Sequence, residues 1–192
     1  MASLSARSTP IETIGAPKTN INYVERQAIR AVVLNTATKQ VALIHVVKGD
    51  CRQNIPPGNL FHLGRCIAKY RLDYKLPGGG VEADEDHKTA LQREILEEIG
   101  CKVAIEDMVL IGASEEYRND LHQISFCYRA SLTEDTGKIE LTADEVEDGL
   151  THEWVDVKKA LQSMEKSQPT NELGRFIKQR DMFFVKTFLD TA

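Results

Sequence analysis

The chain has 192 residues, of which 42% are hydrophobic and 28% are charged, and its formal net charge at pH 7 is −5. That length and apolar content suffice for one globular domain with a sizeable core. A negative charge without a dense Lys/Arg run argues against a nucleic-acid polymer as the main partner, whereas small phosphorylated ligands are compatible. No apolar stretch approaches the roughly 18 residues of a membrane helix, so no membrane association is expected.

The N-terminal residues carry few apolar anchors. The first twenty are rich in Ser, Thr, Ala and Pro. This composition favours a flexible arm, to which we assign residues 1–26, and residues 27–190 are assigned to the single domain. The N-terminus lacks a continuous hydrophobic signal core, so a cytoplasmic protein is expected. Met1–Thr9 contains Arg7 and no acid, which makes an organelle-targeting leader the alternative.

Two runs rich in β-branched residues, Ala28–Asn35 and Gln40–Val47, flank Thr36–Lys39 and predict a β-hairpin. Arg30 lies inside the first of these strands. In one interpretation it is a solvated or paired surface residue. In the other its side chain points at the glycine-rich turn further along the chain and grips a substrate phosphate through its planar guanidinium.

The segment that follows the hairpin is unusually long. Cys51–Asp73 contains Pro56-Pro57-Gly58 and four basic residues, without a clear hydrophobic period. Loops longer than about 12 to 15 residues are uncommon in compact domains. Three explanations stay open: a loop that covers the substrate, a passive surface insertion that costs little free energy, and translated sequence that the working protein lacks.

A glycine-rich turn, Lys75–Glu82, precedes an amphipathic helix. Glu94, Glu97 and Glu98 fall at positions i, i+3 and i+4, so they share one helical face. An apolar stripe at the same spacing predicts the buried side of the helix: Leu91, Ile95 and Ile99. Clustered carboxylates repel one another unless a cation joins them, and carboxylate oxygens suit Mg²⁺ or Mn²⁺. The pattern therefore predicts a divalent metal site.

The run from Gly79 to Cys101 resembles the Nudix box, G-x5-E-x7-R-E-U-x-E-E-x-G-U, in which U is an aliphatic residue. The matching residues are Gly79, Glu85, Arg93, Glu94, Ile95, Glu97, Glu98 and Gly100. Cys101 replaces the last aliphatic residue, a mild departure because cysteine behaves as a small hydrophobe. The resemblance implies an α/β (α+β) Nudix-like fold with a mixed β-sheet sandwiched between helices. Relative to that family, residues 51–73 are an atypical insertion.

The resemblance also implies residue roles. Glu94, Glu97 and Glu98 would be catalytic and would bind Mg²⁺ or Mn²⁺ together with the carbonyl group of Gly78. Two further residues would brace the loop and the helix: Glu85 and Arg93. Two glycines would let the backbone approach the substrate closely: Gly79 and Gly80. An ordinary acidic surface helix would not explain a glycine turn at the required offset.

Past this motif, two runs predict strands around a polar turn, Val103–Ser114 and Leu121–Leu132. His122 on the second strand is expected to be a structural residue and not a base. Lys158–Met164 and Leu173–Leu189 predict two helices that close the domain.

An acidic stretch, Asp144–Asp148, precedes Trp154. Its position resembles the loop from which several Nudix hydrolases draw an additional carboxylate, as a metal ligand or general base. Glu147 is the first candidate for that role, with Glu145 and Asp148 as alternatives. The competing interpretation is a solvated acidic loop.

Two hypotheses about function follow. The first is a Mg²⁺-dependent Nudix hydrolase that cleaves the diphosphate linkage of a nucleoside diphosphate or triphosphate derivative by attack of water on phosphorus. The second is a Nudix-like binding or regulatory module for a nucleotide or metabolite. Within the first, oxidised nucleotides, ADP-ribose or NADH, dinucleoside polyphosphates and isoprenoid diphosphates all stay open as substrates. Homodimerisation is compatible with the sequence.

Overall fold

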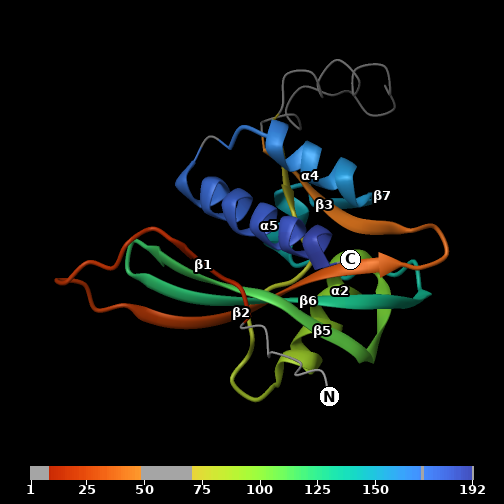
Figure 1. Ribbon diagram of the computed structural model, residues 1–192, viewed down its shortest axis with the longest axis horizontal. Coiled ribbons are helices and arrows are strands. Elements are labelled where there is room, and N and C mark those ends of the chain that lie inside the picture. The colour runs from red at the N-terminus through yellow and green to blue at the C-terminus, as the bar shows by residue number, and fades with distance from the viewer. Residues whose placement is uncertain (1–8, 49–70, 170, 192) are drawn as a thin grey trace, which may run out of the picture.

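The computed structural model describes residues 9–48, 71–169 and 171–191, and within them a mixed seven-stranded sheet is covered by helices (Figure 1). The strands are β1 (Ile11–Ile14), β2 (Val24–Asn35), β3 (Gln40–Lys48), β4 (Arg71–Lys75), β5 (Cys101–Arg118), β6 (Leu121–Asp135) and β7 (Thr151–Asp156). The helices are α2 (His87–Ile99), α3 (Ala143–Glu147), α4 (Val157–Lys166) and α5 (Glu172–Thr191). The strand order is β1-β5-β6-β2-β3-β4, and β7 pairs with β3.

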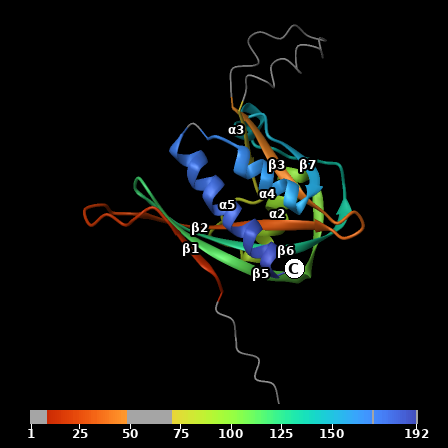
Figure 2. The ribbon, with the colours of Figure 1, turned by 45° about the horizontal axis from the view of Figure 1, so that its top comes forward.

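Alternation along β2 divides the apolar core between the two faces of the sheet. Ile29, Ala31 and Val33 pack toward α2, where Leu91, Ile95 and Ile99 complete one cluster. Val32 faces the opposite way and joins a second cluster with Met164 of α4 and Phe184 of α5. Helix α2 therefore lies on one face, and α4 and α5 lie together on the other (Figures 1 and 2). This arrangement confirms the expected fold class of a mixed sheet between helices.

Strands β2 and β3 separate soon after their turn, and the glycine-rich segment fills the gap. The two strands pair only at Leu34 with Val41 and at Asn35 with Gln40. Beyond that point β2 bonds to residues 77–81 instead. The N–H groups of Ala31, Ile29 and Val81 donate to the carbonyls of Pro77 (2.9 Å), Gly79 (2.9 Å) and Gln27 (3.0 Å), respectively. The turn is thus built into the middle of the sheet.

Helix α2 has well-formed ends. The Asp86 side chain caps its N-terminus by accepting a hydrogen bond from Thr89 N at 2.8 Å. Gly100 ends the helix in the left-handed conformation, and its N–H reaches the carbonyls of Ile95 and Leu96. These caps fix the length of the helix and the direction of its acidic face.

Two boundaries differ from the sequence-based expectation. Residues 1–26 were expected to form a flexible arm, but β1 lies within them and pairs in parallel with β5, from Ile11 with Ala113 to Ile14 with Glu116. The insertion was expected to reach residue 73, but residues 71–73 belong to β4. Residues 1–8 and 49–70 lie outside the described residues, and with them the leader and most of the insertion.

The predicted elements after the motif are confirmed with longer bounds. Strands β5 and β6 extend past the predicted runs and meet in a short turn at Asn119, which has a positive φ of 52°. Helices α4 and α5 take the places predicted for the two closing helices. Among the described residues, no helix combines the length and the apolar character that crossing a membrane requires.

Two glycines with nearly equal φ allow a test of the α2 C-cap. Gly100 (φ 65°) and Gly137 (φ 64°) are both left-handed. A Cβ at Gly100 would lie 2.8 Å from the carbonyl oxygen of Lys138, whereas a Cβ at Gly137 would meet nothing within 4 Å. We expect Gly137→Ala to lower the free energy of unfolding by about 1–2 kcal/mol through backbone strain alone. Gly100→Ala should cost about 1–3 kcal/mol more, because the cap must also shift.

Urea denaturation of both variants beside the wild type measures the difference. Equal losses would show that contact with Lys138 does not constrain the end of α2.

Candidate functional site

Glu98 is the most buried carboxylate of the acidic face, and it joins α2 to the glycine-rich turn. Its side chain is 2% exposed. One carboxylate oxygen, Oε2, accepts the Gly78 N–H at 2.6 Å, and the other, Oε1, accepts Lys75 Nζ at 2.8 Å. Burial of a carboxylate is costly without such donors. The structure therefore fixes Glu98 against Gly78 through two charge-assisted contacts.

Arg93 links the rest of the acidic face to the same turn. Its Nη1 donates to Glu94 Oε1 at 2.9 Å and to Glu97 Oε2 at 3.3 Å. Its Nη2 donates to the Gly80 carbonyl at 3.1 Å and to Glu85 Oε1 at 2.5 Å. The hydrogen bond from Arg93 lowers the pKa of the Glu85 carboxyl. The contacts of Glu85 and Arg93 are those of a brace between loop and helix.

Glu94 lies directly against Gly79. A Cβ added to Gly79 would overlap the Glu94 carboxylate in its present position, so glycine allows this approach. Burial raises the pKa of Glu94, and the nearby charge of Glu98 raises it further, although Arg93 acts in the opposite direction. A positive charge placed here would be stabilised.

The donor chemistry of the cluster fits a hard divalent cation. Four carboxylates, those of Glu85, Glu94, Glu97 and Glu98, contact two cationic side chains, those of Arg93 and Lys75. If all are ionised, four negative and two positive charges leave a formal charge of −2. The described residues contain no group of three or more His, Cys, Asp or Glu side chains already arranged to hold a metal ion. Carboxylates that suit such a cation are present, but their oxygens contact Arg93, Lys75 and the Gly78 N–H.

Arg30 lies beneath the turn and not on the surface. It is 9% exposed, and its Nη1 donates to the carbonyls of Ile29 (2.7 Å) and Gly79 (3.3 Å). Burial and the charge of Arg180 lower its pKa to about 10. The interpretation of Arg30 as a solvated surface residue is therefore wrong. Its contact with Gly79 supports the turn from inside the sheet.

Arg26 is the cation at the open side of the turn. It is exposed, and a Cβ on Gly80 would lie 2.8 Å from its Nη2. Sequence reasoning missed this residue. The spacing could have indicated it, because Arg26 lies four positions before Arg30 and shares its face of the strand.

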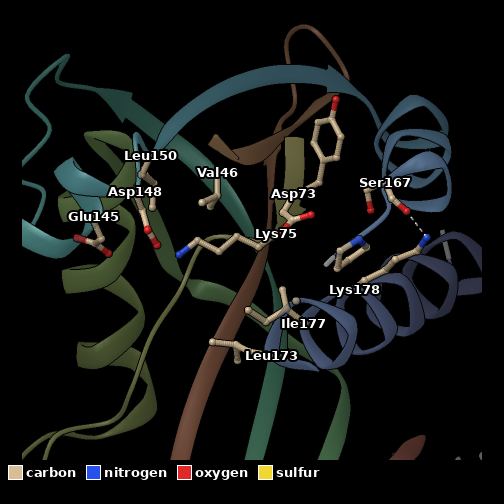
Figure 3. Close-up of a pocket in the computed structure, with 13 residues that line it drawn as sticks. Val46, Asp73, Lys75, Glu145, Asp148, Leu150, Ser167, Leu173, Ile177 and Lys178 are labelled. Atoms are coloured by element: carbon tan, nitrogen blue, oxygen red, sulfur yellow. Dashed lines mark hydrogen bonds between the residues drawn. The ribbon is translucent and has the colours of Figure 1, made fainter. Parts of the chain in front are cut away.

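A pocket of about 130 Å³ opens beside Lys75 (Figure 3). Its lining combines side chains of β3, β4, the α3 region and the start of α5: Val46, Asp73, Tyr74, Lys75, Glu145, Asp148, Leu150, Leu173 and Ile177, among others. Figure 3 shows Lys75 reaching along the pocket toward Asp148. Since Lys75 Nζ also bonds Glu98, the pocket and the acidic cluster are adjacent.

The acidic stretch contributes to this pocket through Glu145 and Asp148. Glu145 is engaged in capping α3, because its carboxylate accepts from Thr142 N and Oγ1, both at 2.9 Å. Glu147, the first candidate from the sequence, is exposed on α3, and the acids among the described lining residues are Asp73, Glu145 and Asp148. Asp148 caps the C-terminus of α3 through its backbone N–H, so among the described lining residues it is the acid of this stretch whose side chain is not engaged in capping.

His122 lies away from this site. Its Nδ1 contacts Glu25 at 2.6 Å, its Nε2 contacts Glu115 at 3.0 Å, and its ring stacks on Tyr117 with centroids 4.5 Å apart. Burial lowers the pKa of His122, but the hydrogen bonds to Glu115 and Glu25 outweigh it, so the pKa is raised overall. These contacts are those of a structural residue.

Comparison with known proteins identifies the family to which the chain belongs. A family model described as the NUDIX domain matches residues 25–174. Among curated proteins, no sequence matches the chain. A solved Nudix hydrolase from Nitrosomonas europaea is similar in fold, with a TM-score of 0.57, 16% identity, and 88% of this chain and 90% of that chain covered.

Two further solved structures share the fold. The MutT protein from Methanosarcina mazei Go1 has a TM-score of 0.52 and 16% identity, with 90% of this chain and 99% of that chain covered. The ORF135 protein of E. coli has a TM-score of 0.52 and 12% identity, with 91% and 94% covered. At such identities these neighbours show the fold alone. The family match covers most of the chain and agrees with that fold, so the chain belongs to the Nudix family.

Proposed function

We propose that this Nudix protein is a Mg²⁺- or Mn²⁺-dependent pyrophosphohydrolase, which cleaves the diphosphate linkage of a nucleoside diphosphate or triphosphate derivative. The observation that carries the proposal is the contact between the acidic face of α2 and the glycine-rich turn. Glu98 and Gly78 are joined at 2.6 Å, and Arg93 bonds Glu94, Glu97 and the Gly80 carbonyl. A module that only binds a metabolite has no need for this set of carboxylates.

In the proposed site, Glu94, Glu97, Glu98 and the Gly78 carbonyl would hold the cation. When bound, a divalent cation neutralises diphosphate oxygens and lowers the pKa of the attacking water. The formal charge of −2 on the carboxylate cluster and its contacting cations matches a divalent ion. Arg93 and Glu85 would keep the carboxylates in place without touching the reacting atoms.

The reaction is hydrolysis of a phosphoric anhydride. The oxygen of water forms a bond to one phosphorus as the bond from that phosphorus to the bridging oxygen breaks. The products are a monophosphate and a second phosphorylated compound, and the proton of the water passes to a carboxylate. Asp148, which lines the pocket beside Lys75, is the proposed proton acceptor, and Glu147 is the alternative.

The remaining contacts suggest where the rest of the substrate lies. Arg26 beside Gly80 would bind phosphate oxygens at the open side of the turn. The pocket beside Lys75, of about 130 Å³, would receive part of the group attached to the diphosphate. Its carboxylates favour a group that donates hydrogen bonds, such as sugar hydroxyls or an amino group of a base. A nucleotide derivative fits this description.

Replacement of Glu97 or Glu98 by Gln removes one ligand charge with little change of shape. We expect each variant to lower the rate of hydrolysis by several orders of magnitude, because the cation is held less tightly and less accurately. Chromatographic detection of the monophosphate product from a panel of nucleoside diphosphate and triphosphate derivatives, with and without Mg²⁺, measures the effect.

Glu134→Gln is the matched control for these two variants. Glu134 is 56% exposed and pairs with Lys102 at 2.8 Å, away from the site, so its loss should leave the rate within twofold. Wild-type rates in both Glu97→Gln and Glu98→Gln would overturn the proposed mechanism.

Arg93→Lys keeps the positive charge of the brace but loses its planar fork. Lys cannot contact Glu85, Glu94, Glu97 and the Gly80 carbonyl together. We expect activity and Mn²⁺ affinity to fall about 10- to 100-fold. Titration of Mn²⁺ by electron paramagnetic resonance gives the affinity, and Arg129→Lys on the exposed side of β6 is the control. An unchanged Mn²⁺ affinity would exclude a bracing role.

Asp148→Asn and Glu147→Gln separate the two candidates for the proton acceptor. If Asp148 accepts the proton, its replacement should lower kcat by about 100-fold or more, whereas Glu147→Gln should stay within twofold. The pair is compared by steady-state kinetics on the substrate that the panel identifies. The opposite ranking would assign the role to Glu147.

A further inference from the structure

Helix α5 carries a buried ion pair that reaches the glycine-rich turn from the face opposite α2. Asp181 is 0% exposed and Arg180 is 2% exposed. Asp181 Oδ2 accepts the Leu76 N–H at 2.8 Å, and its Oδ1 accepts Arg180 Nε at 2.7 Å. A charged side chain of the C-terminal helix is therefore bonded directly to the backbone that leads into the turn.

The backbone of the turn explains why this contact is needed. Strand β4 ends at Lys75, and Leu76 is fully buried, so its N–H requires an acceptor within the protein. Pro77 has no N–H. The next donor, the Gly78 N–H, bonds Glu98 at 2.6 Å. Both N–H groups between residues 76 and 78 thus go to buried carboxylates, one from each side of the sheet.

The surroundings of Arg180 hold the Asp181 carboxylate in a fixed orientation. Arg180 Nη1 lies 3.6 Å from Glu116 Oε1. That oxygen also accepts hydrogen bonds from Ser125 Oγ at 3.0 Å and from Ser114 Oγ at 3.2 Å. Burial of a carboxylate costs free energy unless such partners offset its lost hydration. The network thus specifies which oxygen of Asp181 faces Leu76.

We propose that Asp181 is a positioning residue for the reaction at α2. By holding the Leu76 N–H, it sets the backbone two residues later, where Gly78 meets Glu98. The inference rests on the proposed function, since the geometry it protects is that of the carboxylate cluster. Asp181 has no direct contact with Glu94, Glu97 or Glu98 among the bonds of the described residues, so its effect on them runs through the turn.

Asp181→Asn tests this with an isosteric change. Asn replaces one of the two acceptor oxygens by an NH2 group, so the amide oxygen can face Leu76 N or Arg180 Nε while the NH2 group meets the other donor. We expect kcat and Mn²⁺ affinity to fall about 10- to 100-fold, with KM changed less than threefold, because the turn and not the substrate pocket is displaced. Hydrogen exchange at the Leu76 and Gly78 amides should become faster, which gives a readout that needs no activity.

Phe184→Leu is the control for a purely structural effect. Phe184 is 0% exposed, lies three residues further along α5, and packs in the apolar cluster on the same face. It should destabilise the helix contact and leave kcat and the exchange at Gly78 unchanged in the folded protein. If Asp181→Asn does not fold, Arg180→Lys takes its place, with an expected three- to tenfold fall in kcat.

Two results would overturn the inference. One is a folded Asp181→Asn with kcat and Mn²⁺ affinity within twofold of the wild type. The other is an equal fall in kcat in Phe184→Leu at matched stability. If the wild type cleaves no compound of the panel, the proposed function fails instead. Hydrogen exchange at the Gly78 amide then tests whether Asp181 positions the turn. An unchanged exchange rate in Asp181→Asn would exclude that role.

Discussion

The structure depends on one buried carboxylate, that of Glu98, which needs hydrogen-bond donors from the protein because water is excluded from its position. It finds them in the Gly78 N–H at 2.6 Å and in Lys75 Nζ at 2.8 Å. Both donors lie at the exit of β4, so the position of α2 and the path of the chain after β4 are fixed by the same contact. A loss of either donor would leave a charge in a low-dielectric environment, at a cost greater than the value of a surface ion pair.

The contact requires a gap in the sheet, and the rest of the fold provides it. Strands β2 and β3 pair at only two positions, and residues 77–81 take the place of the missing ladder. The turn therefore has neighbours on three sides: the backbone of β2, Glu98 of α2 and Asp181 of α5. Elements far apart in sequence converge on a few residues. Glycine is required at 78, because a Cβ there would overlap the Ile29 carbonyl, and glycine at 79 leaves room for the Glu94 carboxylate.

The sequence predicted what depends on local spacing. The i, i+3, i+4 pattern of Glu94, Glu97 and Glu98 identified the acidic face, and β-branched content or alternation identified β2, β3, β5 and β6. It could not predict contacts that depend on tertiary pairing. The sequence places Arg30 in a strand but does not tell which face of the sheet its side chain lies on. In the structure Arg30 lies on the same face as Val32, which packs under α4 and α5, and it is buried.

Other features that the sequence did not predict also depend on tertiary contacts. Strand β1 has four residues of weak pattern, and its partner in β5 is about one hundred residues away. Asp181 lies in a helix with an amphipathic pattern, and its hydrogen bond goes to Leu76, 105 residues away. The local sequence therefore does not indicate this contact. Asp148 could be named as a candidate from composition, but its preference over Glu147 depends on which side of a short helix faces Lys75.

The distribution of charge connects this architecture to the proposed chemistry. Arg93 spreads one positive charge over Glu85, Glu94 and Glu97, and among the described residues Lys75 pairs with Glu98. Two cations cannot offset four carboxylates, and burial and the charge of Glu98 raise the pKa of Glu94. The fold thus uses helix packing and backbone hydrogen bonds to hold together charges that repel one another. If the proposed site binds a divalent cation, folding has already supplied part of the free energy of gathering the carboxylates.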